Sequence, residues 1–316
     1  MAKKVLLSGV KPTGRPHVGN YFGAMKQFVE LQGKYDAYIF IADLHALTTV
    51  QNKEELEENT AGVLLDYMAI GLDPKKVTLY KQSDVPQVAE LAWIFNCLTT
   101  VPYLERAHAY KDAVMNKKEP NVGLFDYPML MAADILIQDA DVVPVGQDQK
   151  QHIEIARDTA QKFNNAFGEC FKLPEPLILG AMATIPGTDG KKMSKSYNNT
   201  IPLFGSDEEI EKAIMGIVTD SGSDMPTNVY AIHSLLRAKD ELDRLYAENR
   251  GQYKKLKEIL IEDMKNFIRP MRERRQALEE DKQAVLEILK SGGKAARERA
   301  ETKMEEVRKL VGLKLY

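Results

Sequence analysis

Short apolar runs alternate with amphipathic stretches over the first 80 residues of the chain. Val5–Leu7, Tyr38–Ala42 and Val77–Tyr80 are short and mostly apolar, as strands buried inside a parallel sheet usually are. The stretches between them, from about His17 to Leu31 and from Glu54 to Ile70, carry apolar residues at helical spacing. Because strands alternate with helices, the pattern predicts an α/β fold with a parallel sheet and right-handed crossovers.

Helical patterns dominate the middle of the chain. The stretch from Pro86 to Phe167 is predicted to be mostly helical, with breaks near Tyr103 and between Asn116 and Pro120. Residues Ile178–Ile185 are predicted to return to the sheet before a polar loop begins. We therefore expect a helical insertion, at about residues 86–176, between two parts of one sheet.

The remainder of the chain is also predicted to be helical. Ser206 precedes three acidic residues, which is typical of an N-cap followed by the first turn of a helix. A later helix is predicted to end at Gly292–Gly293. The best single boundary lies near residue 205 and separates an α/β domain, residues 1–205, from a helical domain, residues 206–316.

Composition narrows the classes of protein that fit this pattern. Hydrophobic residues make up 44% and charged residues 28% of the 316 residues, the balance of a globular protein. No apolar run approaches the roughly 20 residues of a membrane-spanning helix, and the first residues do not resemble a signal peptide. Cys97 and Cys170 fit no metal-ligand spacing, so we expect reduced thiols and a cytoplasmic location. The net charge of −3 does not indicate nucleic-acid binding, although a local basic face would suffice for it.

The first predicted strand leads into a helix through a glycine-containing loop, Gly9–Asn20. The N-terminus of a helix offers unpaired backbone N–H groups and a positive dipole end to an anion. Gly19 would let a flat base lie against the helix, because glycine has no side chain to prevent the approach. The spacing matches neither the dinucleotide-binding fingerprint nor the P-loop, so an ordinary tight turn is the alternative for this loop alone.

A second candidate loop lies at Lys192–Ser196. Lys192 and Lys195 are three residues apart among small residues, and their ammonium groups can present two positive charges to a polyphosphate. A solvated lysine cluster is the usual explanation of a basic run, but the sequence Lys-Met-Ser-Lys-Ser, combined with the first loop, is too particular for that explanation.

A third segment, Tyr127–Leu136, combines polar and apolar side chains at helical spacing. Tyr127, Met131 and Asp134 fall on one face of the predicted helix. The neighbours of Asp134 are mostly apolar, which favours a buried carboxylate over a surface position or a helix cap. Asp141–His152 follows this helix.

These segments resemble a known family. His17–Asn20 and Lys192–Ser196 resemble the two signature sequences of class I aminoacyl-tRNA synthetases, and Tyr127–Leu136 with Asp141–His152 is similar to the tryptophanyl branch. The resemblance covers the chain to about residue 215 and, more loosely, the helical tail. It implies a Rossmann-like catalytic domain, a helical domain for the tRNA anticodon, and ATP-dependent activation of L-tryptophan followed by its transfer to tRNA(Trp).

An indole is flat and apolar with one N–H donor, so its pocket should be apolar with one buried acceptor. Asp134 is positioned to be that acceptor. The apolar walls are expected from Leu7, Met131, Val143 and Val145. The resemblance implies that Tyr127 and Gln149 hold the ammonium and carboxylate end of the amino acid. His45 follows the second predicted strand, at the edge where open parallel sheets bind ligands.

The resemblance also implies an ATP site. Lys192 and Lys195 would stabilise the pentacovalent phosphate. Lys111 would lie near the diphosphate, and His17 would form a hydrogen bond to a phosphate of ATP. Gly146 and Asp148 would hold the ribose. The full set expected to bind ATP is Lys11, Pro12, Thr13, Gly19, Asn20, Gly146, Gln147, Asp148, Ile185, Lys192, Met193, Ser194, Lys195 and Ser196. One Mg²⁺ is expected on the ATP phosphates, and no metal bound by the protein itself.

Two positions depart from the family pattern. Lys11 stands where many bacterial relatives carry an amide before the proline, so its partner is open between the substrate carboxylate and the phosphates. Asn20 replaces the second signature histidine, a variant that the tryptophanyl branch tolerates. The other three histidines, His108, His152 and His233, are expected to be structural.

Three alternatives compete with this interpretation. A tyrosyl-tRNA synthetase shares the architecture, but the phenol hydroxyl would need a polar partner that Val5–Leu7 does not offer. A nucleotidyltransferase that acts without tRNA would not need the long helical tail with its arginines. A non-catalytic tRNA-binding paralogue would be expected to have a damaged Lys192–Ser196 loop.

The resemblance further implies a homodimer built around the first part of the insertion, about Pro86 to Tyr127. Apolar side chains in Pro86–Tyr103 exceed what one helix face needs, namely Val88, Leu91, Ala92, Ile94, Phe95, Leu98, Val101 and Tyr103. The alternative is that these side chains only cover the sheet.

Overall fold

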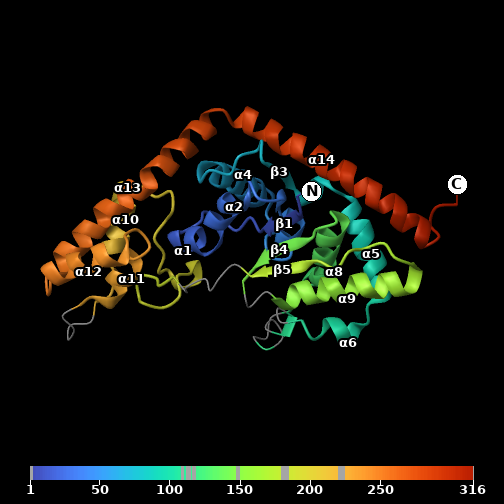
Figure 1. Cartoon of the computed structure of the whole chain (residues 1–316), viewed down its shortest axis with the longest axis horizontal. Coiled ribbons are helices and arrows are strands. Elements are labelled where there is room, and N and C mark those ends of the chain that lie inside the picture. The colour runs from blue at the N-terminus through green and yellow to red at the C-terminus, as the bar shows by residue number, and fades with distance from the viewer. Residues whose placement is uncertain are drawn as a thin grey trace.

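A five-stranded parallel sheet forms the centre of the computed structural model, which describes residues 3–107, 110–111, 115, 119–146, 150–178, 185–219 and 225–315. The strand order is β3-β2-β1-β4-β5, and all neighbours run parallel. The strands are β1 (Val5–Val10), β2 (Asp36–Ile41), β3 (Val77–Lys81), β4 (Val142–Val145) and β5 (Glu175–Ile178). The predicted Rossmann-like α/β class is confirmed (Figure 1).

The first half of the sheet follows the predicted pattern closely. Between β1 and β2 the chain forms a loop and then a continuous helical stretch, made of α1 (Val18–Asn20), the π-helical segment η1 (Tyr21–Met25) and α2 (Lys26–Leu31). From β2 to β3 it passes through α3 (Asp43–Ala46) and α4 (Lys53–Ala69). The first strand is three residues longer than predicted, because Ser8, Gly9 and Val10 continue its pairing with β2.

The middle of the chain was predicted less well. After β3 come η2 (Gln82–Asp84), α5 (Gln87–Leu98), α6 (Val101–Leu104) and α8 (Val122–Ile137), and α9 (Lys150–Phe167) separates β4 from β5. The prediction of a mostly helical stretch from Pro86 to Phe167 missed β4, whose four residues are all buried between β1 and β5.

A four-residue run that contains a proline carries little strand signal by itself, and pairing on both sides makes it a strand. The expected return to the sheet at Ile178–Ile185 was also misplaced, since β5 begins at Glu175 and ends at Ile178. The predicted insertion at 86–176 therefore includes the strand β4. The last helix of the insertion before this strand is α8.

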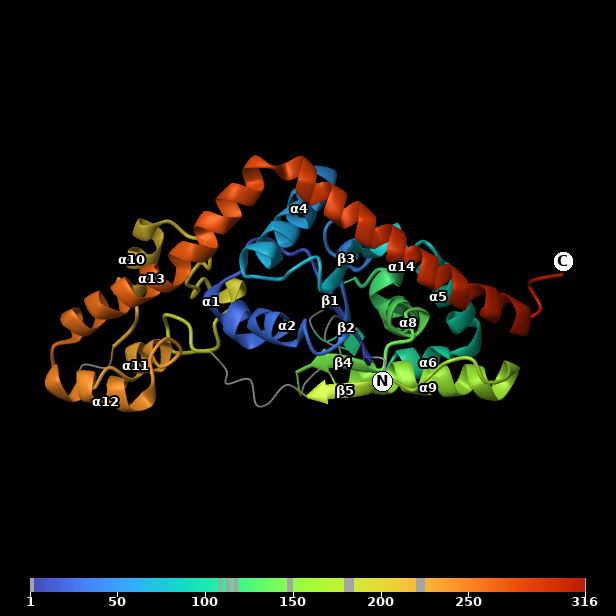
Figure 2. The ribbon, with the colours of Figure 1, turned by 45° about the horizontal axis from the view of Figure 1, so that its top comes forward.

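The C-terminal region is helical in its described residues. It contains α10 (Asp207–Met215), α11 (Thr227–His233), α12 (Lys239–Glu248), α13 (Tyr253–Glu280) and α14 (Lys282–Leu310). Ser206 caps α10 as predicted, because its hydroxyl accepts the Glu209 N–H while the Glu209 carboxylate accepts the Ser206 N–H. Figures 1 and 2 show α13 and α14 meeting at a wide angle, with α10, α11 and α12 beside α13.

Helix α14 returns to the sheet and crosses β3, the strand at one end of it. The prediction that a helix ends at Gly292–Gly293 was wrong, since both glycines lie inside α14. A Cβ atom at Gly292 would lie 1.8 Å from the carbonyl oxygen of Leu79, and one at Gly293 would lie 2.7 Å from a carboxylate oxygen of Asp84. The glycines therefore permit a close approach of two backbones, which is a role that a helix terminator does not have.

Apolar side chains fill both faces of the sheet. Leu6 of β1 joins a cluster with residues of α4 and α13, whereas Val5 and Leu7 join a second cluster with residues of α5, α8 and α9. Helix α14 contributes to both clusters. The last part of the predicted helical domain thus shares the core of the α/β domain, and the boundary near residue 205 stays a prediction.

Within the described part of the chain, no helix combines the length and the apolar composition needed to cross a membrane.

The packing of α14 on β3 gives a stability prediction. Gly292→Ala should lower the free energy of unfolding by about 1–3 kcal/mol, because the new methyl group overlaps the Leu79 carbonyl. Gly62→Ala is the matched control: Gly62 also lies inside a helix, α4, but nothing stands within 4 Å of its Cβ position. That variant should be neutral or stabilised by up to about 1 kcal/mol through helix propensity. Chemical denaturation measures both, and equal effects would contradict the proposed close packing.

Candidate active site

A cavity of about 970 Å³ lies at the carboxyl ends of β1 and β4. These two strands are neighbours, yet the chain leaves β1 toward β2 and β3 before it returns to β4. Open α/β sheets bind ligands where the strand order reverses in this way. The walls come from the loop after β1, α1, α4, α8, the start of α9 and the loop at Ser194–Ser196.

A buried carboxylate of the cavity wall belongs to Asp134 of α8, which is 3% exposed. Its Oδ2 lies 3.0 Å from Nε2 of His45. The side-chain amide of Gln82 donates to both carboxylate oxygens, at 2.9 Å to Oδ1 and 2.8 Å to Oδ2. Burial raises the pKa of Asp134, and the hydrogen bonds from His45 and Gln82 oppose that rise.

Gln82 was missed by the sequence analysis. It lies directly after β3, and its Oε1 accepts the backbone N–H of His45 at 3.2 Å. The signal that could have found it is its place at the carboxyl end of a parallel strand, which is the criterion that singled out His45.

Apolar side chains surround Asp134 on the cavity side. The predicted wall residues all line the cavity, namely Leu7, Met131, Val143 and Val145. Tyr127 and His45 line it too. The structure therefore brings an apolar surface and one buried acceptor together, as an indole pocket requires.

One further polar side chain faces this half of the cavity. His152 lines it beside Tyr127, and its Nε2 lies 3.0 Å from the Tyr127 hydroxyl. The sequence favours a structural role for His152, and its place in the cavity wall is additional to that role. His233 does fit a structural role, because it is buried between Tyr246 and Asp263 of the helical region. His108 lies outside the described residues.

The other half of the cavity is formed by the two loops with signature sequences. His17 caps α1: its Nδ1 accepts the Asn20 N–H, and Oδ1 of Asn20 accepts the His17 N–H. Burial, with a smaller contribution from the charge of Lys195, lowers the pKa of His17 to about 4. The ring is therefore neutral at pH 7. Since Nδ1 accepts a hydrogen bond, Nε2 carries the proton and can donate.

Gly19 has a role other than the one expected from its sequence. A Cβ there would lie 2.9 Å from Nδ1 of His17 and 3.2 Å from the Cβ of Met193. The space beside Gly19, where the sequence predicts a ligand base, is therefore filled by these two side chains. The Gly19 N–H donates to the sulfur of Met193 at 3.2 Å. The missing side chain thus lets the two signature loops dock on each other.

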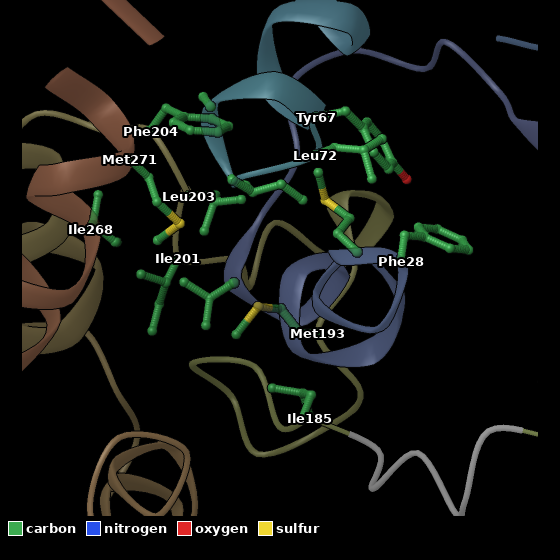
Figure 3. Close-up of a cluster of buried hydrophobic side chains, with 14 of the residues drawn as sticks. Phe28, Tyr67, Leu72, Ile185, Met193, Ile201, Leu203, Phe204, Ile268 and Met271 are labelled. Atoms are coloured by element: carbon green, nitrogen blue, oxygen red, sulfur yellow. The ribbon is translucent and has the colours of Figure 1, made fainter. Parts of the chain in front are cut away.

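Met193 anchors the second loop in an apolar cluster. Figure 3 shows its side chain near Ile201 and beside the helix that begins at α1, with Ile268 and Met271 of α13 on the other side of the cluster. Ile185 is buried in the same cluster. Ser194, Lys195 and Ser196 are thereby held at the cavity. Nζ of Lys195 donates to the Thr13 carbonyl at 2.7 Å, which joins the two loops a second time.

The remaining candidates for ATP binding divide into three groups. Lys11, Thr13, Asn20 and Gly146 line the cavity. Pro12, Gly19, Ile185, Lys192 and Met193 belong to the same loops or lie next to them but are not among the residues that line it. Gln147 and Asp148 lie outside the described residues, as does Gln149, which was expected to bind the amino acid.

Lys11 and Lys111 lie in different surroundings. Nζ of Lys11 donates to the Thr48 hydroxyl at 3.2 Å, and burial lowers the pKa of Lys11. Lys111 is exposed and is not among the described residues that line the cavity.

A buried ion pair supports the half of the cavity that is formed by the two signature loops. Asp66 of α4 lines the cavity, and its carboxylate accepts from Nε of Arg275 on α13 at 2.6 Å. Burial raises the pKa of Asp66, and the positive charges of Arg275, Arg15 and Lys195 oppose the rise. The sequence analysis missed this pair, which joins the helical region to the cavity wall.

Across the described ranges, no group of three or more His, Cys, Asp or Glu side chains is arranged to hold a metal ion.

The chain is similar to known proteins over nearly its whole length. The model of the family described as tRNA synthetases class I (W and Y), those for tryptophan and tyrosine, matches residues 2–290. A tryptophan–tRNA ligase of Fusobacterium nucleatum is 49% identical over 317 residues, with 97% of each chain covered. One from Rhodopirellula baltica is 46% identical over 318 residues, which cover 98% of this chain and 99% of the relative.

A solved structure is similar over the same extent. The crystal structure of the tryptophanyl-tRNA synthetase from Campylobacter jejuni, complexed with ADP and tryptophan, has a TM-score of 0.92 with this chain. The two sequences are 41% identical, and the match covers 98% of this chain and 99% of that one.

Proposed function

The chain belongs to the tryptophan–tRNA ligases among the class I tRNA synthetases, and from that premise we propose that its cavity holds L-tryptophan at Asp134 and ATP at the two signature loops. The activity is that of an aminoacyl-tRNA ligase, which joins L-tryptophan to tRNA(Trp) and converts ATP to AMP and diphosphate. The observation that carries the proposal is the buried carboxylate of Asp134 in a mainly apolar wall, next to the loops that carry the signature sequences.

Asp134 would accept the indole N–H, and Leu7, Met131, Val143 and Val145 would contact the ring. A smaller apolar amino acid would leave part of this wall without contacts and the carboxylate without its partner, which is costly in a dry site. Tyr127 and Gln149 would hold the ammonium and carboxylate end. Tyrosine is the poorer fit, since β1 places the apolar side chain of Leu7 in the wall of the cavity, where a phenol hydroxyl would need a polar partner.

In the first step, a carboxylate oxygen of tryptophan attacks the α-phosphorus of ATP, and the bond from that phosphorus to the diphosphate oxygen breaks. Positioning and charge stabilisation suffice for such a step, so no covalent nucleophile of the protein is needed. Lys195, Lys192 and the Nε2–H of neutral His17 would stabilise the charge on the phosphates, with Lys111 near the diphosphate. Gly146, Gln147 and Asp148 would hold the nucleoside. In the second step, a ribose hydroxyl of the terminal adenosine of tRNA takes the tryptophanyl group and releases AMP.

Mg²⁺ would bind through the phosphates of ATP. The carboxylate of Asp66, near Lys195, is already paired with Arg275. The ion would supply positive charge to the polyphosphate.

The helical region after residue 205 would bind the anticodon part of tRNA(Trp), and the enzyme would act in the cytoplasm. The path of α13 supports the proposal of anticodon binding, because this helix extends from α12 to the cavity wall. Through the ion pair of Arg275 with Asp66, a movement of α13 on binding tRNA would reach the cavity.

A homodimer would form through α5, α6 and the start of α8. Five of the side chains that the sequence suggested for this surface are buried inside the chain instead, namely Val88, Leu91, Ala92, Ile94 and Phe95, because α5 packs on α8, α9 and α14. The surface that supports a dimer is a different one. Trp93 of α5 is 70% exposed, and Val101 and Val122, the first residues of α6 and α8, are exposed as well. Exposed aromatic and aliphatic side chains are typical of the centre of an interface.

The activity is tested by diphosphate exchange into ATP with each standard amino acid. Tryptophan should support exchange far better than tyrosine, phenylalanine or any aliphatic amino acid. Exchange that depends on tyrosine instead would overturn the assignment.

Asp134→Asn tests the indole acceptor. The neutral amide should weaken recognition of tryptophan by about 1.5–3 kcal/mol, because a charged acceptor is lost, while the affinity for ATP stays unchanged. Exchange kinetics at varied tryptophan concentration measure the effect. An unchanged dependence on tryptophan would remove Asp134 from the pocket.

Lys195→Ala tests the charge of the second signature loop. The variant should lower the rate of adenylate formation about 100-fold or more and weaken ATP binding far less, because the charge acts mainly on the transition state. Pre-steady-state kinetics separate the two effects. Lys191→Ala, the removal of an exposed lysine beside the same loop, is the control and should change neither. Equal losses in rate and affinity for Lys195→Ala would contradict the role.

Light scattering at micromolar concentration tests the dimer. The active protein should have twice the sequence mass of 35.6 kDa, and Trp93→Glu should shift it toward the monomer because a charge is costly at the centre of an apolar interface. A single active species near 35.6 kDa for the unmodified protein would show that the dimer proposal is wrong.

A further inference from the structure

Gln82 has no role in the proposed contacts with tryptophan, ATP or tRNA, yet its side chain is 0% exposed and lies directly behind the proposed indole acceptor. It is the first residue of η2, the short turn that follows β3. A buried primary amide has to find partners for one oxygen and two N–H bonds, so the partners it has define its function.

The orientation of this amide is fixed by its two contacts. Its Oε1 accepts the backbone N–H of His45 at 3.2 Å, and its Nε2 lies 2.9 Å and 2.8 Å from the two carboxylate oxygens of Asp134. A flipped amide would place an oxygen against the carboxylate and an NH₂ group against an N–H. Both contacts would then be repulsive, so only one orientation is compatible with this site.

The two oxygens of Asp134 are used unequally. Oδ2 lies within hydrogen-bonding distance of both His45 Nε2 and Gln82 Nε2. Among the described residues, Oδ1 has only Gln82 Nε2 as a partner. A carboxylate oxygen can accept more than one hydrogen bond, so Oδ1 keeps acceptor capacity for a donor in the cavity.

The position of Gln82 is itself held from two sides. On one side, the carboxylate of Asp43 accepts the N–H of Ser83 at 2.9 Å and its hydroxyl at 2.5 Å. On the other side, Nε of Arg297 of α14 donates to the Asp84 carbonyl at 2.6 Å, and Gly293 packs against the Asp84 side chain. The turn is therefore fixed by the first residue of α3 and by the C-terminal helix α14, and the amide has little freedom to move.

We propose that Gln82 is a positioning residue that determines specificity for an indole N–H, by holding the Asp134 carboxylate with Oδ1 toward the cavity. The inference rests on the proposed binding of tryptophan at Asp134. Gln82 does not touch the substrate, and it acts by fixing the plane of the acceptor and by keeping a charged acceptor favourable in an apolar wall.

The test compares L-tryptophan with 3-benzothienyl-L-alanine, in which sulfur replaces the indole N–H and the shape is nearly kept. Diphosphate exchange gives kcat/KM for both amino acids, and their ratio measures how strongly the enzyme selects the N–H. In Gln82→Met, which keeps the length of the side chain and removes its hydrogen bonds, the ratio should fall about tenfold or more. The loss should lie in KM for tryptophan, while kcat/KM for the analogue changes little.

Gln138→Met is the matched control. Gln138 is also fully buried, but its amide donates to the Ala296 carbonyl at 3.1 Å and not to Asp134. This variant should leave the ratio unchanged. If Gln82 were merely part of the packing, Gln82→Met would lower kcat/KM for both amino acids equally and keep the ratio, and that outcome would overturn the proposal.

Two further variants distinguish a failure of the Gln82 proposal from a failure of the acceptor assignment or of folding. Asp134→Asn should lower the same ratio, and an unchanged ratio in that variant would show that the acceptor assignment is wrong. If the ratio falls in Asp134→Asn but not in Gln82→Met, only the role of Gln82 is overturned. If Gln82→Met does not fold, Gln82→Glu takes its place, because it keeps the length and the oxygen that accepts the His45 N–H. Failure of both variants to fold would make the amide a requirement of the fold and overturn the proposal.

Discussion

The structure depends above all on a carboxylate buried in an apolar wall. An ionised group in such a place is costly unless hydrogen bonds replace its water. For Asp134 these bonds come from His45, after β2, and Gln82, after β3, while the carboxylate itself projects from α8. Three segments far apart in the chain therefore have to meet at one edge of the sheet. The parallel register of β1, β2 and β3 brings the ends of the strands to that edge. Helix α14 packs against the turn after β3 and fixes its position.

The half of the cavity that is formed by the two signature loops depends on a different contact, the docking of these loops, which are about 175 residues apart in the sequence. The Gly19 N–H meets the sulfur of Met193, and Lys195 reaches the Thr13 carbonyl. Both contacts are weak individually, but Met193 is also held in the apolar cluster that includes Ile268 and Met271 of α13 (Figure 3). With the buried pair of Asp66 and Arg275, this cluster makes one long helix a direct support of the loops.

The two halves of the cavity also differ in how much of them the sequence could predict. The signature loops and the helix around Asp134 are local patterns, so Leu7, Tyr127, Met131, Asp134 and Lys195 were identified and do line one cavity. The residues behind them were missed, because Gln82, Asp66 and Arg275 carry no local pattern. A glutamine after a strand or an arginine inside a helix becomes informative only when its partner is known, and each partner is supplied by another segment.

The sequence by itself determined the parallel α/β architecture of the first half, the cap at Ser206, the helical tail and the location of the candidate chemistry, because periodicity, capping and motifs are properties of neighbouring residues. Only the tertiary structure decided that Val142–Val145 is a strand, since its pairing with β1 and β5 outweighs a weak local preference. It also decided that Gly292 and Gly293 continue a helix, because their function is to let α14 approach the backbone of β3. In both cases a contact between distant segments, which no local pattern encodes, supplied the deciding free energy.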